Sequence, residues 1–258
     1  MIRLAPSPAH AAPTAKPAAT VEQPLSFGSD YVDRRLGGGL LRRAVHEVFA
    51  GSVEDGSAAA GFTLMLAMRA CPIGGRVIWI RDQKCARGSG TLHAVGLVEL
   101  GFDPDDLVLV DAPDTLAVLR AGADSVKCGQ VGAVVMEPCG KAPLLDLTAS
   151  RRLSLAAAAS GVPTLILRVD AAPQPSAAQT RWQVASAPSA PLPANAPGNP
   201  AFTLTLLRHR GGVAGFETRL EWNRDARCFA PLSGGVSTAA ADRADHVLHF
   251  PGQYARVA

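Results

Sequence analysis

Five short apolar runs, separated by segments of helical character, constrain the fold of this chain more than any other feature of its sequence. Each run is apolar almost throughout rather than at alternate positions. The runs are residues 44–50, 76–80, 107–111, 132–137 and 164–169. Continuous apolar strands are expected where both faces of a sheet are covered, as in parallel sheets. The pattern therefore predicts an α/β fold.

The segments between these runs carry helix signals. Residues 57–70 are rich in good helix formers, and residues 91–100 are followed by Gly101, which is suited to end a helix. Asp114 and Asp146 stand where an N-cap carboxylate is needed, so we expect a helix after each of them. Strands joined by helices require right-handed crossovers, which predicts one mostly parallel sheet flanked by helices on both faces.

The pattern changes after Asp170. Residues 181–185, 202–210 and 216–222 have strand character, and two glycines separate the last two segments. These two segments predict a C-terminal antiparallel β-hairpin that extends one edge of the sheet. Between them and the preceding strand, residues 186–200 are rich in Pro, Ala and Ser and predict a long surface loop.

The composition of the two ends separates them from the middle of the chain. Residues 1–24 are dominated by Ala, Pro, Ser and Thr, so we expect a flexible tail, and residues 231–258 are expected to form a second tail. The core then spans residues 25–230, and the 48% of hydrophobic residues in the chain supports a sizeable core. A net charge of +3 is too small to argue for nucleic-acid binding by itself.

Cysteine usage and hydropathy indicate the compartment. The five cysteines are widely spaced and form no C-x-x-C pair, which favours a reduced cytoplasmic protein over a disulfide framework or a zinc site. The N-terminus lacks the apolar segment of a signal peptide, and the longest apolar run, residues 58–68, is too short to span a bilayer. We therefore expect a soluble, cytoplasmic protein with no membrane partner.

The stretch GSAAAGFT, from Gly56 to Thr63, has the spacing of the phosphate-binding P-loop G-x-x-x-x-G-K-[ST], with Phe62 in place of the lysine. It follows the first predicted strand and runs into the first predicted helix, which is the context that a P-loop requires. Loss of a charge stabiliser such as this lysine costs on the order of 10²–10³-fold in rate. Backbone N–H groups can still hold an anion weakly, but we expect no efficient hydrolysis. The alternative is a strand-to-helix connection whose glycines, Gly56 and Gly61, serve packing alone.

The other candidate positions give no catalytic set. Gln83 follows the second apolar run, where a general base would be needed, and Glu137 ends the fourth run, where a Walker B acid would hold Mg²⁺. Pro138 follows Glu137 at once, and we favour an ordinary strand-end glutamate. His246 and His249 lack a third ligand. We therefore predict that this chain has no catalytic residue and binds no metal and no cofactor.

Several longer stretches resemble a known family. FGSDYVDRRLGGGL (27–40), LGFDPDDLVLVDAPDTLAVL (100–119) and GQVGAVVMEP (129–138) resemble the RecA-type ATPase core. PSAAQTRWQVASAPS (175–189) and the LLRHRGG…FETRLEWN hairpin (206–223) are more specific and are similar to the ImuA family, whose members are related to RecA. The similarity covers roughly residues 25–230 and predicts a RecA-like fold.

The resemblance also implies a function. It implies a non-catalytic RecA-fold adaptor in the SOS response to DNA damage, acting in translesion DNA synthesis beside an ImuB-like relative of the Y-family polymerases and an error-prone polymerase of the replicative class. It further implies binding to RecA, with DNA reached through the partners. Two alternatives stay open: an active RecA-like ATPase that binds single-stranded DNA, and a SulA-like inhibitor of cell division.

Transferred onto this chain, the RecA motifs leave the ATPase positions unfilled. The resemblance places Phe62 at the lysine, Gln83 at the catalytic glutamate and Arg168-Val169 at the nucleotide-sensing pair. Gly56, Gly61 and Thr63 match as loop geometry. We therefore expect the fold without the enzyme activity.

The last segment of the chain carries one apolar cluster. Val247, Leu248 and Phe250 lie in the tail of residues 231–258 and are predicted to bind a partner's groove. The alternative is that Leu248 and Phe250 dock on this protein's own sheet.

Overall fold

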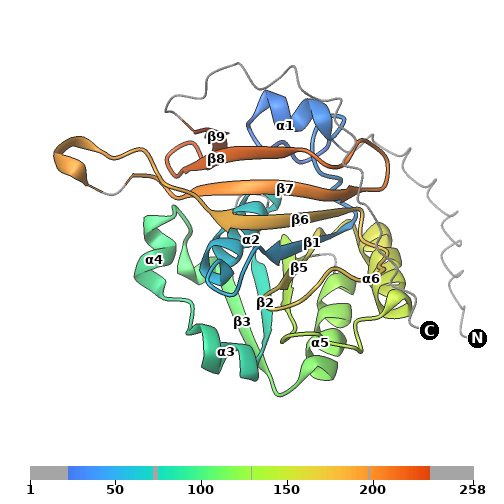
Figure 1. Ribbon diagram of the computed structural model, residues 1–258. Coiled ribbons are helices and arrows are strands. Elements are labelled where there is room, and N and C mark those ends of the chain that lie inside the picture. The colour runs from blue at the N-terminus through green and yellow to red at the C-terminus, as the bar shows by residue number, and fades with distance from the viewer. Residues whose placement is uncertain (1–22, 72–74, 129, 197, 233–258) are drawn as a thin grey trace, which may run out of the picture.

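The computed structural model describes residues 23–71, 75–128, 130–196 and 198–232. Within them a single sheet has the strand order β3-β2-β4-β5-β1-β6-β7-β8-β9 (Figure 1). Its strands are β1 (Val45–Ala50), β2 (Val77–Asp82), β3 (Leu107–Ala112), β4 (Ala133–Glu137), β5 (Thr164–Arg168), β6 (Thr180–Ser186), β7 (Ala201–His209), β8 (Glu217–Asn223) and β9 (Cys228–Pro231). The helices are α1 (Asp30–Arg35), α2 (Gly56–Ala70), α3 (Gln83–Ser89), α4 (Ala94–Glu99), α5 (Thr115–Lys127) and α6 (Leu147–Ser160), with short 3-10 turns η1 (Pro104–Asp106) and η2 (Pro193–Asn195).

The five strands expected from the apolar runs are β1 to β5, and they lie side by side and parallel in this sheet. Strand β6 adds a further parallel strand on the other side of β1. Strands β7 and β8 pair antiparallel, as expected for the hairpin, and β9 pairs antiparallel with β8 beyond it. The predicted α/β fold and its antiparallel extension are confirmed.

Each face of the sheet has its own core. On one face the largely buried α2 packs with aromatic side chains from the segment before α1 and from β6 to β9. On the other face α5 and α6 cover the strands β1, β2, β4 and β5. Alternate residues of a strand serve the two faces, so that in β2 Trp79 belongs to the first core and Ile80 to the second.

The expected helix caps are present. Asp114 accepts a hydrogen bond from the Ala117 backbone N–H at 2.8 Å and so begins α5. Asp146 accepts one from Ala149 at 2.7 Å and begins α6. The helix predicted over residues 91–100 is shorter, because α4 begins only at Ala94. Helix α3, which precedes α4, is not expected from any local pattern.

The connection between β6 and β7 projects from the body of the molecule in Figure 1, as the predicted surface loop of residues 186–200 requires. None of the described helices is long and apolar enough to cross a membrane. The tail of residues 1–24, except its last two residues, lies outside the described residues. The same holds for Val247, Leu248 and Phe250, and for His246 and His249.

Candidate functional site

The structure corrects the placement of the P-loop-like motif. Helix α2 begins at Gly56, so Gly61, Phe62 and Thr63 lie inside the helix rather than at its entrance. The expectation that Gly56, Gly61 and Thr63 match as loop geometry is therefore wrong, because the whole motif is helical. The Thr63 hydroxyl is fully buried and donates to the Ala59 carbonyl at 2.7 Å. It faces the core and cannot meet a metal ion or a phosphate.

Phe62 is a core residue. Its side chain is 0% exposed, and its ring centroid lies 5.3 Å from that of Phe229, 5.9 Å from Phe202 and 6.2 Å from Phe27. Aromatic pairs at these separations each add stability beyond the area that they bury. The residue at position 62 therefore joins α2 to the antiparallel half of the sheet.

A second stretch with P-loop spacing lies between the end of β1 and the start of α2, where a P-loop would stand. Gly51 follows β1 directly, Gly56 begins α2, and the four residues between them form the connecting loop. In this register Ser57 and Ala58 stand at the lysine and hydroxyl positions. GSVEDG has this spacing five residues before GSAAAG, but its register lacks the hydroxyl that Thr63 supplies, so the sequence alone did not indicate it. The motif lysine is absent in both registers.

This loop is tied to the end of β6. Asp55 Oδ1 accepts hydrogen bonds from the Ser186 backbone N–H at 2.8 Å and from its hydroxyl at 2.9 Å, while Oδ2 accepts one from Ser52 at 3.0 Å. The Ser186 N–H is the main reason that the pKa of Asp55 lies below its ordinary value. With Glu54 beside it, the loop places two carboxylates at the entrance to α2. Such charges oppose a phosphate at this helix end.

Gly56 is closely packed at the helix entrance. A Cβ added there would lie 3.2 Å from the Val169 side chain at the end of β5.

Arg168, which the resemblance places in the nucleotide-sensing pair, is bonded to the loop after β4. Its Nη2 donates to the carbonyls of Gly140 at 3.1 Å and Lys141 at 2.9 Å. Burial lowers the pKa of Arg168. Arg168 therefore supports the loop after β4.

Glu137, at the end of β4, is bound by the protein's own side chains. Its Oε2 accepts a hydrogen bond from Trp79 Nε1 at 2.9 Å and lies 3.5 Å from Arg81 Nε. All three side chains come from neighbouring strands, because β2 pairs with β4 so that Arg81 stands opposite Glu137. Burial raises the pKa of Glu137, while the Arg81 charge and the Trp79 hydrogen bond lower it. Gln83 begins α3 and is exposed.

A cavity of about 330 Å³ opens above this trio. Its walls come from one face of α2, from residues 90–100 and from the ends of β2, β4 and β5. The described lining residues are Gly56, Ser57, Ala60, Gly61, Leu64, Trp79, Arg81, Gly90, Thr91, Leu92, His93, Gly96, Leu97, Leu100, Glu137 and Val169. Apolar walls with a few convergent polar groups are typical of binding sites.

A second cavity, of about 410 Å³, lies in front of the α2 entrance. Lys84 and Asp170 bring opposite charges to it, and Cys85 and Cys139 line it together. Burial and the neighbouring Cys139 raise the pKa of the Cys85 thiol, which therefore is a poor nucleophile. The described residues contain no group of three or more His, Cys, Asp or Glu side chains that could hold a metal ion.

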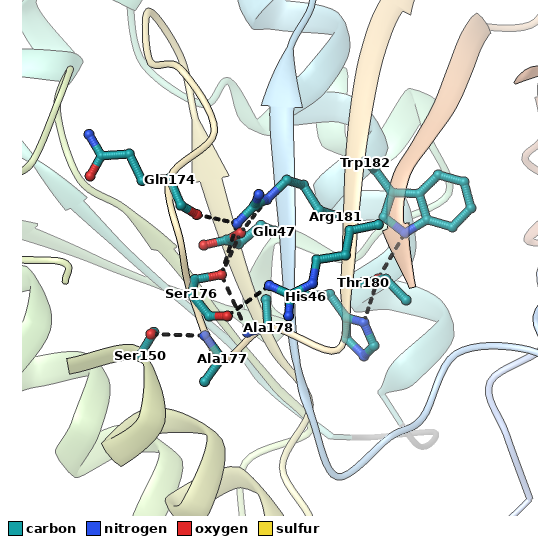
Figure 2. Close-up of polar contacts among 11 residues, drawn as sticks. His46, Glu47, Ser150, Gln174, Ser176, Ala177, Ala178, Thr180, Arg181 and Trp182 are labelled. Carbon is teal, nitrogen blue, oxygen red and sulfur yellow. Dashed lines mark hydrogen bonds and ion pairs between the residues drawn. The ribbon is translucent and has the colours of Figure 1, made fainter. Parts of the chain in front are cut away.

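The family-like stretch of residues 175–189 has a structural role that Figure 2 shows. Glu47 Oε2 accepts hydrogen bonds from Arg181 Nε at 2.8 Å and from the Ser176 hydroxyl at 2.9 Å. The Ala177 backbone N–H donates to Ser150 Oγ at 3.0 Å, which joins the segment to α6. These contacts hold the chain between β5 and β6 against the sheet.

Comparison with known proteins indicates a family and a fold for this chain. No protein-family model matches the sequence. "Protein ImuA" from two strains of Caulobacter vibrioides is 35% identical over 206 residues, which covers 74% of this chain and 80% of the relative. Among solved structures, the RadB recombinase superposes with a TM-score of 0.52 at 16% identity, covering 80% of this chain and 98% of that one. The structural likeness shows a RecA-like fold.

Proposed function

Because the chain belongs to the ImuA family, we propose that it is a non-catalytic adaptor with a RecA-like fold in DNA-damage-induced mutagenesis. In this role it acts in translesion synthesis with an ImuB-like relative of the Y-family polymerases and an error-prone polymerase. It also binds RecA, and it reaches DNA through these partners. The protein works in the cytoplasm.

The observation that carries this proposal is the chemistry of the connection between β1 and α2. A P-loop holds phosphates with free backbone N–H groups and a lysine charge. Here Ser57 takes the lysine position, and Glu54 and Asp55 precede the helix. Charge-assisted hydrogen bonds contribute about 1.5–3 kcal/mol each, so the lost lysine and the two carboxylates act together against tight phosphate binding.

The state of Glu137 supports the same proposal. A metal-binding acid at the end of β4 must be ionised and open to the ion. Burial raises the pKa of this carboxyl, and one of its oxygens is already bonded to Trp79. A carboxylate in this position serves the protein's own structure rather than a magnesium ion.

Two measurements on the full chain test the proposal. Purified protein should release no phosphate from ATP above background, with or without single-stranded DNA. The tagged protein should capture the ImuB-like protein and RecA from cells with damaged DNA. A useful control is the double variant Ser57→Lys/Ala58→Thr, which restores both motif residues in the structural register and should still be inactive, because Gln83 leaves the base position empty.

The two alternatives predict different results. Steady ATP turnover that a Gly51→Pro variant abolishes would contradict the non-catalytic proposal and favour an ATPase. Recovery of a cell-division protein, with neither the ImuB-like protein nor RecA, would favour a division inhibitor.

A further inference from the structure

We propose that the cavity of about 330 Å³ between α2 and α4 binds a partner's peptide segment that inserts an apolar side chain and presents a carboxylate to Arg81. This inference deepens the adaptor proposal and rests on it for the identity of the occupant as a protein. The binding chemistry itself follows from the walls and floor of the cavity.

The cavity exists because the first two turns of α2 carry only small residues on the face that lines it. Gly56, Ser57, Ala60 and Gly61 form this face, one and four positions apart along the helix. A Cβ added at Gly61 would meet no heavy atom within 4 Å. Glycine within a helix is less stable than alanine. Gly61 therefore keeps a space open at the expense of helix stability, although nothing around it requires a glycine.

The floor of the cavity holds a buried cation that is poorly bonded. Arg81 is only 4% exposed. Its Nε lies within ion-pair distance of Glu137 at 3.5 Å but donates no hydrogen bond to any described residue. Glu137 Oε2 is instead bonded to Trp79. Buried guanidinium groups are expected to be hydrogen-bonded, so Arg81 has donor capacity that the described residues leave unused.

A carboxylate is the acceptor that fits best. A guanidinium matches the two oxygens of a carboxylate in a bidentate geometry. Glu137 balances the charge of Arg81 but leaves its Nε without a hydrogen bond. The cavity therefore offers a hydrogen-bond donor that a carboxylate can use.

The surroundings indicate that the anion is carried by a protein. Leu64, Leu97 and Leu100 give the cavity apolar walls. Apolar surface continues outside it: Leu109 on the edge strand β3 is 39% exposed and stands opposite Trp79. On the outer face of α4, Val95 and Val98 are 59% and 60% exposed, and α4 packs on η1, which leads into β3. Apolar surface that reaches from a cavity to a sheet edge is typical of protein contacts.

The carboxylate requirement can be tested with two matched probes. N-acetyl-L-leucine carries an apolar side chain and a carboxylate, whereas N-acetyl-L-leucinamide carries the same side chain without the charge. We would titrate each into the ¹⁵N-labelled full chain and follow the Trp79 indole N–H, assigned with Trp79→Phe. We expect saturable shifts with the acid and at least tenfold weaker binding of the amide. Equal binding of both probes, or no binding of the acid, would overturn the proposal.

Variants separate the cavity from its neighbours. Gly61→Leu fills the cavity and should abolish binding of the acid in a folded protein, whereas Gly61→Ala should retain binding. Arg81→Gln should remove the preference for the acid, and Lys84→Gln, in the neighbouring cavity, should leave it unchanged. Mg·ATP should neither displace the acid nor shift the Trp79 signal; displacement would assign the cavity to a nucleotide and overturn the proposal.

Capture experiments distinguish this inference from the adaptor proposal. Gly61→Leu should also reduce capture of a partner by the full chain at least tenfold, relative to Gly61→Ala. If both variants capture the ImuB-like protein and RecA equally well, the adaptor proposal stands and the cavity is not its binding site. If the unmodified chain captures neither, the adaptor proposal fails even where the acid probe binds, and the occupant named here fails with it.

Discussion

The buried His46 makes the stability of this protein depend on pH in a way that one substitution isolates. Its Nε2 lies 2.8 Å from the Leu41 carbonyl, which can only accept, so Nε2 carries the proton. Its Nδ1 then accepts from the Thr180 hydroxyl at 2.8 Å, and the same hydroxyl accepts from Trp182 Nε1 at 3.0 Å (Figure 2). The imidazole is thus held neutral between β1 and β6.

The size of the effect follows from the lowered pKa. Burial lowers the pKa of His46 from 6.5 to about 4; the hydrogen bond with Leu41 opposes this change, and the charge of His209 adds to it. Because the folded pKa lies below the unfolded value, stability is fully present above pH 6.5 and is lost as the pH falls toward 4. Each pKa unit corresponds to ~1.4 kcal/mol, so the loss is about 3 kcal/mol in full. About 2.5 kcal/mol of it falls between about pH 7.5 and about pH 4.5.

Urea unfolding of the wild type and of His46→Gln at these two pH values measures this contribution. Glutamine does not titrate, so the free energy of unfolding of the wild type should fall by about 2.5 kcal/mol more than that of the variant. For a chain of this size, this corresponds to a melting temperature lower by about 5–10 °C. His93→Gln, at an exposed position, should behave as the wild type. Parallel pH dependence in wild type and His46→Gln would refute the reasoning, whatever the absolute stability of the variant.

Three further predictions concern the core, the buried ion pair and the tail. Phe62→Lys should lower the free energy of unfolding by at least about 3–5 kcal/mol, as for truncation of a buried aromatic ring. Ser57→Lys, at an exposed position, should change it by less than about 0.5 kcal/mol, as denaturant unfolding would show. Glu47→Gln breaks the ion pair with Arg181 and should cost about 3–5 kcal/mol, whereas Asp124→Asn in the exposed pair with Lys127 should cost under about 1 kcal/mol; equal effects would contradict the importance of burial. Truncation after Leu232 removes Val247, Leu248 and Phe250 and should reduce capture of the ImuB-like protein and RecA at unchanged melting temperature; a large drop in that temperature would show that the tail stabilises the core.

The parts of the fold that depend on local signals could be predicted from the sequence. The parallel strands are apolar almost throughout, and the helices α5 and α6 follow capping aspartates. Both kinds of element can therefore be predicted from local patterns. Strand β9 carries no such signal. It has four residues and is defined by its pairing with β8 and by the hydrogen bond from the Phe229 N–H to the Phe27 carbonyl. Contacts between segments 200 residues apart in the chain cannot be seen in a local pattern.

The candidate site was harder to predict because two overlapping motifs compete. The spacing of two glycines occurs from Gly51 to Gly56 and again from Gly56 to Gly61, and Thr63 favoured the second. Only the position of the first helical residue, Gly56, decides between them, and the spacing of the glycines does not indicate it. Arg81 follows the second apolar run but has no role that a local pattern indicates, because its contact with Glu137 arises from the pairing of β2 with β4.

The hydrogen bonds of the connection between β1 and α2 explain how α2 is held in place. In a phosphate-binding loop, the ligand satisfies backbone N–H groups and so orders the connection. Here Asp55 binds the Ser186 backbone and hydroxyl, and the Gly51 N–H donates to the Val184 carbonyl at 2.8 Å. The protein thus supplies from β6 the order that a phosphate would otherwise give, and α2 is held in place without a ligand. A helix fixed in this way can pack Phe62 on one side and leave the small residues of its other face open to a partner.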